Sequence, residues 1–245
     1  GSFGLSNSVR GVFSLSNSTT QNTMEFIVMA TDADSADFGD LVAGRAYRPQ
    51  SASHATRGVI AGGYDVAVMN EMDYITIASA GNATDFGNLS VARYNMPSQA
   101  MSSTVRSVFT GGSTGSTVDV MDYITVASTG NATDFGNLTV ARYYGCCANN
   151  TTRGIMANGN QSGDDNTIDY ITIGTTGNAT DFGDTTVTNS SDRCAVHSST
   201  IAYLVGGQYQ ITMATAGNST SSGYGTFAAN ENKDSVMPGW LAYNG

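Results

Sequence analysis

The chain has 245 residues and a formal net charge of −10 at pH 7, and only 12% of its residues are charged. Binding to phosphate backbones needs clustered lysine and arginine, whereas this chain has 10 such residues against 20 acidic ones, so we expect no nucleic-acid partner. No apolar run approaches the roughly 18 residues of a membrane span, and we therefore expect no membrane insertion.

Turn-forming residues dominate the composition. Glycine contributes 29 residues and proline only 3, and Ser, Thr and Asn fill the spaces between short apolar runs. This composition predicts an all-β chain of strands and turns without helical blocks. The first residues lack the basic, apolar and cleavage regions of a signal peptide. Because the chain starts at Gly1 and not at a methionine, we expect it to be a processed or trimmed piece of a longer protein.

One motif recurs along the chain around an aromatic residue. Its copies are TDADSADFGDL, SAGNATDFGNL, STGNATDFGNL and TTGNATDFGDT, with a degenerate fifth copy, and the aromatic positions are Phe38, Phe86, Phe135, Phe182 and Tyr224. The steps between them are 48, 49, 47 and 42 residues (38 to 86, to 135, to 182, to 224). A fixed period in this range indicates a repeat architecture. We expect one domain over residues 1–245, with repeats at about 1–49, 50–97, 98–146, 147–193 and a degenerate 194–245.

Each repeat is predicted to contain about four strands. Apolar runs such as TRGVIAGG end at glycine pairs, which favour turns with positive φ or close backbone approach. Alternating segments such as MDYITIA, from Met72, follow and predict a strand with one buried face. The DFG string is predicted to be a turn whose Phe fills the core between repeats, and segments such as LSVAR predict a further short strand.

The order of these signals resembles the kelch repeat. That pattern runs from a glycine pair to Tyr, then Trp, then a downstream Arg, and here Phe stands in the place of Trp in each of the first four repeats. The resemblance covers nearly the whole chain and implies a β-propeller of about five four-stranded kelch-like blades. The segments DYITIA, TGNATDFG and LTVAR also resemble repeats in tail and virion proteins of aquatic bacteriophages.

The two ends of the chain carry similar segments. GWLAYNG, at residues 239–245, matches RGIMANG at residues 153–159, which suggests one surplus strand. We expect the N-terminal segment to complete the last blade, so that no sheet edge is left free. The alternative is that the surplus strand pairs with another subunit.

Arginine falls on two repeated positions. One position holds Arg10, Arg57, Arg106 and Arg153, with Thr200 in the fifth place, and the other holds Arg45, Arg93 and Arg142. Carboxylates recur before the strand aromatic, at Glu25, Asp73, Asp122 and Asp169. The structural interpretation is that each Arg meets a carboxylate or carbonyl at a seam between blades. The functional alternative is an arginine-lined channel mouth that binds an acidic sugar or another anion.

The two histidines, His54 and His197, are predicted to share one ring position with Asn7, Ser103 and Asn150. Residues in different blades are too dispersed for the short ligand distances of a metal centre, so a polar rim is preferred. The acidic turns around Asp37 and Asp85 lack the spacing and the bidentate Glu of an EF-hand loop. We therefore predict neither a metal site nor a cofactor.

Catalytic residues of propeller enzymes usually occur in one or two blades and break the repeat. This chain offers few residues of that kind. Glu71 and Glu231 are the best isolated acids, but nothing places a second carboxylate at the separation that glycoside hydrolysis requires. A glycan-processing propeller enzyme is therefore the lowest-ranked alternative, and we predict no enzymatic activity. The three cysteines form no even disulfide framework; Cys147 and Cys194 lie one repeat apart and are predicted to be buried apolar side chains.

The leading hypothesis is a structural and binding module at a virion surface or in an extracellular location, such as part of a tail fibre or a capsid-surface protein. Its partners would be other virion proteins, copies of itself and a host cell-surface glycan. The candidate ligand-binding rim contains aromatic, basic and imidazole side chains: His54, His197, Arg57, Arg106, Arg153, Tyr94, Tyr143, Tyr144 and Trp240. Tyr64 joins them as an aromatic that suits sugar rings. The alternatives are that these aromatics fill blade seams, and that the chain is an extracellular scaffold that assembles into filaments.

Overall fold

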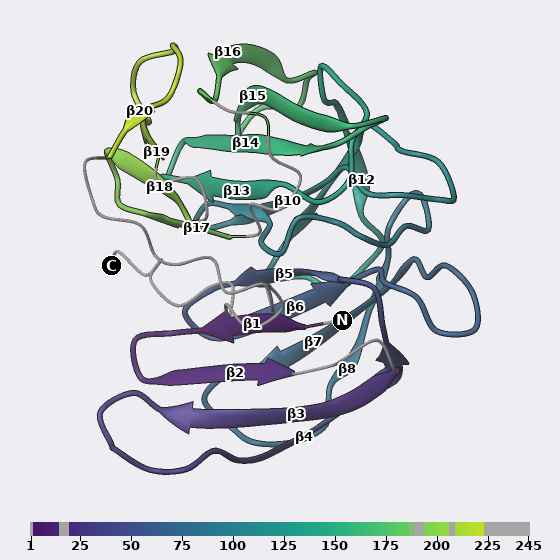
Figure 1. The fold of residues 1–245 in the computed structure, drawn as a ribbon. Coiled ribbons are helices and arrows are strands. Elements are labelled where there is room, and N and C mark those ends of the chain that lie inside the picture. Colours follow the sequence, from purple (N-terminus) through teal and green to yellow (C-terminus); the bar gives the residue numbers. More distant parts are fainter. Residues whose placement is uncertain (1, 15–19, 187, 189–193, 206–208, 223–245) are drawn as a thin grey trace.

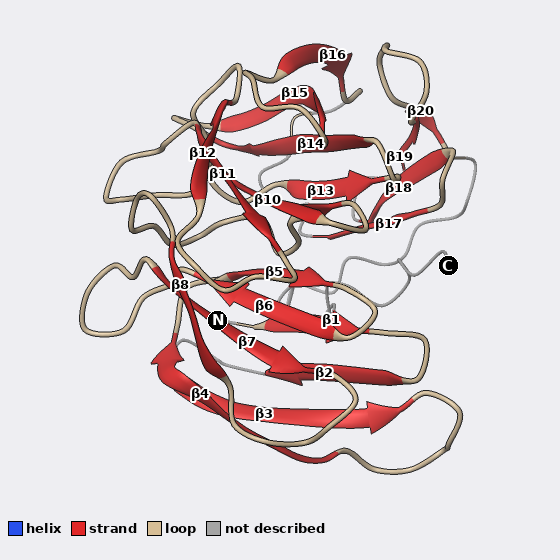
Figure 2. Ribbon diagram, turned by 180° about the vertical axis from the view of Figure 1, so that it is seen from behind, coloured by secondary structure: helices blue, strands red, loops and turns tan. Residues whose placement is uncertain are grey.

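The computed structural model describes residues 2–14, 20–186, 188, 194–205 and 209–222. These residues form strands, turns and loops, and none of them is helical. Figure 2 shows the strands in red and the loops and turns that join them in tan.

Five antiparallel sheets of four strands each make up the described chain, and within a sheet the strands lie in sequence order. We call them units 1 to 5. Unit 1 consists of β1 (Phe3–Ser6), β2 (Arg10–Ser14), β3 (Gln21–Val28) and β4 (Ala36–Arg45). Unit 2 consists of β5 (Gln50–Ser53), β6 (Arg57–Ala61), β7 (Glu71–Thr76) and β8 (Thr84–Asn88). Unit 3 consists of β9 (Met101–Ser102), β10 (Arg106–Thr110), β11 (Val120–Thr125) and β12 (Thr133–Asn137).

The last two sheets follow the same plan. Unit 4 consists of β13 (Cys146–Asn149), β14 (Arg153–Asn160), β15 (Asp164–Thr172) and β16 (Thr180–Asp184). Unit 5 consists of β17 (Cys194–His197), β18 (Ile201–Val205), β19 (Tyr209–Thr212) and β20 (Thr220–Ser221). The predicted all-β class and the predicted four-stranded repeats are confirmed.

The first strands of successive units lie side by side, in the order β1, β5, β9, β13 and β17. In Figure 1, unit 1 lies at the bottom, unit 4 at the top and unit 5 at the upper left, so the sheets succeed one another around the molecule. This arrangement is consistent with propeller-like stacking.

The hydrophobic core is divided among the seams between units. Each of four buried clusters joins two successive sheets; the first packs Leu5 and Val12 of unit 1 on Ile75 and Ile77 of unit 2. The repeated Phe takes part in every seam, and it also meets the aromatic of its own third strand edge to face, as Phe86 meets Tyr74. The prediction that Phe fills the core between repeats is confirmed.

Two strand assignments from the sequence are wrong. The DFG string lies within the fourth strand of units 1 to 4, and its Gly has a positive φ there. The segment that follows, predicted to be a strand, belongs to β4 in unit 1 but is a linker in units 2 and 3. The first strand of each unit was missed, since segments such as QSAS at residues 50–53 are short and have no apolar alternation.

The expected completion of the last blade by the N-terminal segment is also wrong. β1 pairs with β2 of its own sheet, and β20 completes the last sheet. The matching segment GWLAYNG lies outside the described residues. The predicted glycine-pair turns are confirmed at Gly62 and Gly63, with φ of 65° and 108°, and at Gly111 and Gly112.

The strand register corrects three of the repeat equivalences predicted from the sequence, each by one residue. Ile201, and not Thr200, takes the fifth arginine place, because it faces Thr212 as Arg153 faces Thr172. His197 faces Ala202 as Asn149 faces Gly154, so Ser198 is the counterpart of His54. Cys194 corresponds by register to Cys146 and not to Cys147. Tyr224 lies outside the described residues.

Candidate functional site

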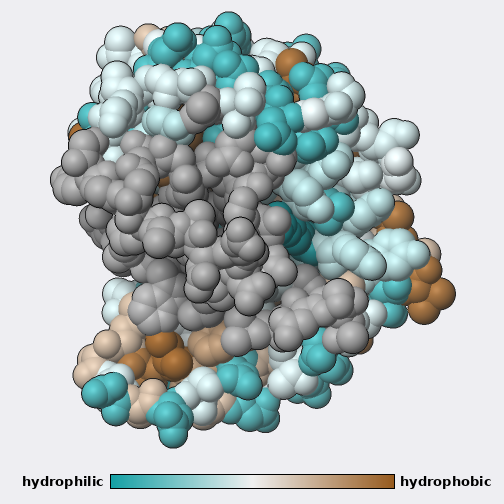
Figure 3. Space-filling view, in the orientation of Figure 1, coloured by the Kyte–Doolittle hydropathy of each residue, from teal (hydrophilic) through white to brown (hydrophobic). Residues whose placement is uncertain are grey.

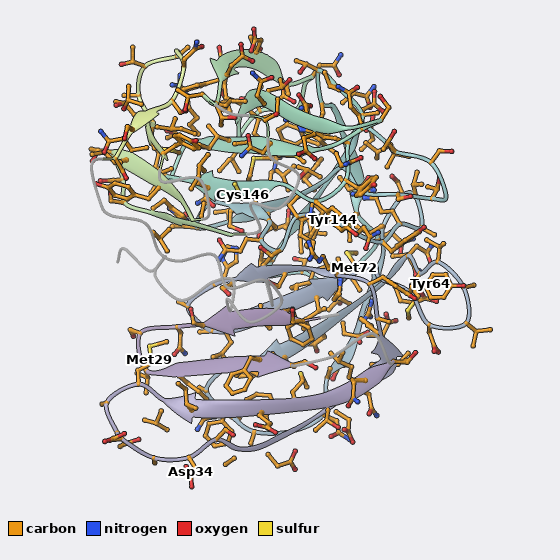
Figure 4. The ribbon with its side chains drawn as sticks, viewed as in Figure 1. Met29, Asp34, Tyr64, Met72, Tyr144 and Cys146 are labelled. Atoms are coloured by element: carbon orange, nitrogen blue, oxygen red, sulfur yellow. The ribbon has the colours of Figure 1, made fainter. Side chains whose placement is uncertain are left out.

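Tyrosines from three linkers and one hairpin gather at one end of the strands. Tyr47, Tyr64 and Tyr94 meet pairwise edge to face, with ring centroids 5.4 Å apart for Tyr47–Tyr64, 5.7 Å for Tyr64–Tyr94 and 6.1 Å for Tyr47–Tyr94. Tyr143 and Tyr144 form a second pair at 4.5 Å, and the Arg48 guanidinium lies 4.4 Å from the centroid of the Tyr144 ring. We call these five tyrosines and Arg48 the tyrosine surface. Figure 4 labels Tyr64 and Tyr144 on the right-hand side of the molecule.

The backbone that carries this surface is held in an uncommon conformation. Tyr47, Arg48, Asn95 and Tyr144 have φ between 48° and 61°, the left-handed region that non-glycine residues rarely adopt. The Asn95 amide donates to the Tyr47 carbonyl, and the Tyr144 amide donates to the Asn95 carbonyl, each at 2.8 Å. Three successive linkers are thus tied to one another, so the rings project from a rigid frame.

Side-chain exposure makes the tyrosine surface accessible. Tyr47 is 48% exposed, and Tyr64, Tyr94, Tyr143 and Tyr144 are half-buried. Tyrosine combines a broad apolar face with a hydroxyl that exchanges hydrogen bonds, and it loses little conformational freedom on binding. The arrangement can therefore stack on a flat, amphipathic ligand.

The predicted rim arginines lie at the opposite end of the same strands. Arg57 begins β6 and Tyr64 follows its glycine pair, a separation of roughly 20 Å along an extended chain. Arg57 donates to the Val126 carbonyl of the next unit at 2.7 Å and stacks on Tyr74 of its own unit. The same two contacts recur at the other copies of this position, namely Arg10, Arg106 and Arg153. The structural interpretation of these arginines is confirmed.

The second arginine set forms buried ion pairs between units. Arg45, Arg93 and Arg142 are each at most 1% exposed. Arg45 lies 2.9 Å from Asp73, Arg93 lies 2.7 Å from Asp122, and Arg142 lies 2.9 Å from Asp169. Every pair joins one unit to the next, so both repeated arginine positions serve the seams.

Burial sets the electrostatics of these pairs. It raises the pKa of Asp73 and Asp169, and the facing guanidinium in each pair opposes that shift. Burial also lowers the pKa of Arg93, while Asp122 acts in the opposite direction. Paired burial of this kind favours the charged forms only while both partners are present.

The two histidines do not share one position. His54 Nε2 lies 3.1 Å from the Ser107 hydroxyl of the next unit, and burial lowers the pKa of this imidazole. Burial also lowers the pKa of His197, although a hydrogen bond with the Asn149 backbone opposes the shift. Both side chains lie at the arginine end of the strands, so the structure separates them from the tyrosine surface.

The acidic segments around the DFG string make local hydrogen bonds and contacts between units. Asp85 accepts from the Gly87 amide of its own strand, β8, at 3.0 Å. Asn82 accepts from the Asp40 amide of the preceding unit at 3.0 Å, a contact that repeats along the chain. Among the described residues, no group of three or more His, Cys, Asp or Glu is placed to hold a metal ion.

Sequence reasoning found only part of the candidate site. It singled out Tyr64, Tyr94, Tyr143 and Tyr144 but omitted Tyr47 and Arg48. The sequence does contain a signal for these two residues. The later linkers ARYN and ARYY share an Arg-Tyr pair, and the first linker carries the variant AYR. Trp240, also in the predicted rim, lies outside the described residues.

No family model matches the chain, and no curated protein matches it. The described residues contain no helix long and apolar enough to cross a membrane.

Proposed function

We propose that the chain is a five-bladed kelch-like β-propeller that serves as a non-enzymatic binding module of a virion surface, in a tail fibre or on a capsid. Its ligand is a host cell-surface glycan, held at the tyrosine surface. The observation that carries this proposal is the edge-to-face cluster of Tyr47, Tyr64 and Tyr94 on a rigid, partly exposed frame. The resemblance of the repeat sequence to repeats of bacteriophage tail and virion proteins supports the location on a virion surface.

The distribution of polar residues also supports binding without catalysis. The repeated arginines of the described chain are engaged at the seams between units, with carboxylates or carbonyls as partners. The tyrosine surface departs from this repetition, since its three linkers carry different residues at corresponding places. Rigid scaffolds commonly bind through such variable loops.

The test is a glycan array probed with the full chain, together with binding to whole host cells. We expect retention of one class of glycan by the native chain and its loss from a Tyr47→Ala/Tyr64→Ala variant. A Val105→Ser variant is the matched control, because Val105 is 61% exposed and lies at the other end of the strands. Equal binding by native chain and tyrosine variant would refute the tyrosine surface as the site.

A further inference from the structure

Unit 1 has one sheet face that no other described unit covers. In units 2 to 4, one apolar residue of the third strand and the apolar residue directly after that strand pack on the preceding unit and are at most 4% exposed: Ile75, Ile77, Ile124, Val126, Ile171 and Ile173. Strand register makes Ile27 and Met29 their counterparts in unit 1. Ile27 is only half-buried, and Met29 is 36% exposed.

The same face carries an acid that, within the part of the chain that the structure describes, has no arginine across a seam. Asp73, Asp122 and Asp169 each receive an Arg from the preceding unit. Their counterpart Glu25 is exposed and accepts from the Ser35 hydroxyl of its own unit at 2.5 Å. Figure 3 shows brown and tan atoms at the lower left, in the region where Figure 4 labels Met29. The face is therefore apolar with one acid, as the matching faces of the later units are.

We propose that residues 223–245, which follow unit 5, dock on this face of unit 1 and take the place of a preceding unit, with Lys233 beside Glu25. Lys233 is the only basic residue of that segment. The acids at this position in units 2 to 4, namely Asp73, Asp122 and Asp169, are each paired with a base from the unit that covers them. Charge complementarity thus matches the segment to the face.

The apolar residues of the segment fit the same role. GWLAYNG, at its end, matches Arg153–Gly159, and Ile155 and Ala157 within that stretch pack on the following unit. By this match, Leu241 and Tyr243 are the residues that would pack on unit 1. The segment has 23 residues (223 to 245), and an extended chain of that length spans up to about 75 Å, enough to cross from unit 5 to unit 1.

A covalent tether favours this segment over a second copy of the chain. Linked partners meet at effective concentrations in the millimolar range, whereas a second copy must bind at its own concentration. Docking within one chain would also bury the exposed apolar residues without forming open-ended assemblies, which head-to-tail contacts produce.

Photo-crosslinking in the full chain tests the proposal. p-Benzoylphenylalanine is introduced at Met29 and, as a control, at Val105, which is also exposed but lies in the β9–β10 turn of unit 3. Equal amounts of ¹⁵N-labelled and unlabelled chain are mixed before irradiation, and the crosslinked peptides are identified by mass spectrometry. We expect crosslinks from position 29 to residues 223–245 within single chains, and none to that segment from position 105.

Crosslinks between labelled and unlabelled chains would assign the face to a second copy and overturn the proposal. Absence of any crosslink from position 29 to the segment would overturn it as well. The ion pair has its own readout in the melting temperatures of Glu25→Lys, Lys233→Glu and the double variant. We expect the double variant to melt above both single variants; additive effects would remove Lys233 from the proposal.

Discussion

At the scale of single residues, the buried arginines hold the seams together. Arg93 and Asp122 are both fully buried, and the guanidinium lies 2.7 Å from the carboxylate and 3.3 Å from the Phe109 carbonyl. Removing one partner leaves a charge in a site that water cannot reach. Each of the three seams that contain such a pair therefore depends on both of its members.

The first prediction concerns this pair. Asp122→Ala is expected to lower the free energy of unfolding by about 3–5 kcal/mol, because Arg93 remains buried without a counter-charge. Chemical denaturation followed by circular dichroism measures the change. The matched control is Asp34→Ala, at an exposed acid in the β3–β4 loop, for which we expect a change within about 0.5 kcal/mol. Similar losses in the two variants would contradict the assignment.

The second prediction concerns His54. Because burial holds the pKa of this imidazole below its ordinary value, the folded state takes up its proton less readily than the unfolded state. The stability that His54 contributes is complete above pH 6.5 and is lost as the pH falls through the lowered pKa. His54→Asn introduces the residue found at the corresponding places Asn7 and Asn150. In this variant, the free energy of unfolding, measured by chemical denaturation, is expected to fall less than in the native chain as the pH is lowered from neutral to acid. If the free energy of unfolding of His54→Asn depended on pH as that of the native chain does, the prediction for His54 would be wrong.

The third prediction concerns the thiols. Cys146 and Cys147 are both buried, and burial raises the pKa of Cys147 to about 12. Both should therefore resist a disulfide reagent at neutral pH. In a Cys194→Ser chain, we expect no labelling in the native state and two labels after unfolding in urea. Rapid native labelling would show that this part of the seam opens readily.

At the scale of elements, the fourth strand of one unit is joined to the turn of the next. The Gly177 amide donates to the Phe135 carbonyl at 2.7 Å, and Asn178 accepts from the Asn137 amide at 3.0 Å. A Cβ added at Gly136 would lie 2.5 Å from the Gly177 carbonyl oxygen, and Gly136 has a φ of +138°. The repeated glycine of the DFG string is thus required by backbone contact between units.

The fourth prediction follows from that contact. Gly136→Ala is expected to destabilise the chain by more than about 1 kcal/mol, because alanine is strained at this φ and its Cβ meets backbone. Thermal unfolding monitors the change. Gly174→Ala is the control: Gly174 has open space around its Cβ direction, and alanine occupies the corresponding places 78 and 127. A control as destabilised as the variant would contradict the explanation.

Periodicity alone located most of these elements. The repeated Phe, the glycine pairs and the two arginine positions were evident because each serves the same contact in several units. The first strands were missed because β9 has only two residues and β5 is mostly polar. The placement of His197 beside His54 failed by one residue, since a strand register cannot be fixed by spacing where the repeat degenerates.

At the scale of the whole molecule, the two ends of the strands differ in character. The arginine end is repetitive and engaged in contacts between units, whereas the opposite end presents tyrosines that vary from linker to linker. The meeting of Tyr47, Tyr64 and Tyr94 could not be predicted from spacing, because it depends on how one sheet stacks on the next. Stacking thus supplies the frame, and the linkers supply the candidate site.

The most direct test of this account is titration calorimetry with the glycan that the native chain retains on an array. The native chain and the Tyr47→Ala/Tyr64→Ala variant are compared, each first shown to be folded by circular dichroism. Stacking on aromatic rings contributes on the order of 1 kcal/mol per contact, so we expect the double variant to bind at least about tenfold more weakly. Unchanged affinity in the folded variant, or no glycan bound by the native chain, would contradict the claim that the tyrosine surface is a glycan-binding site.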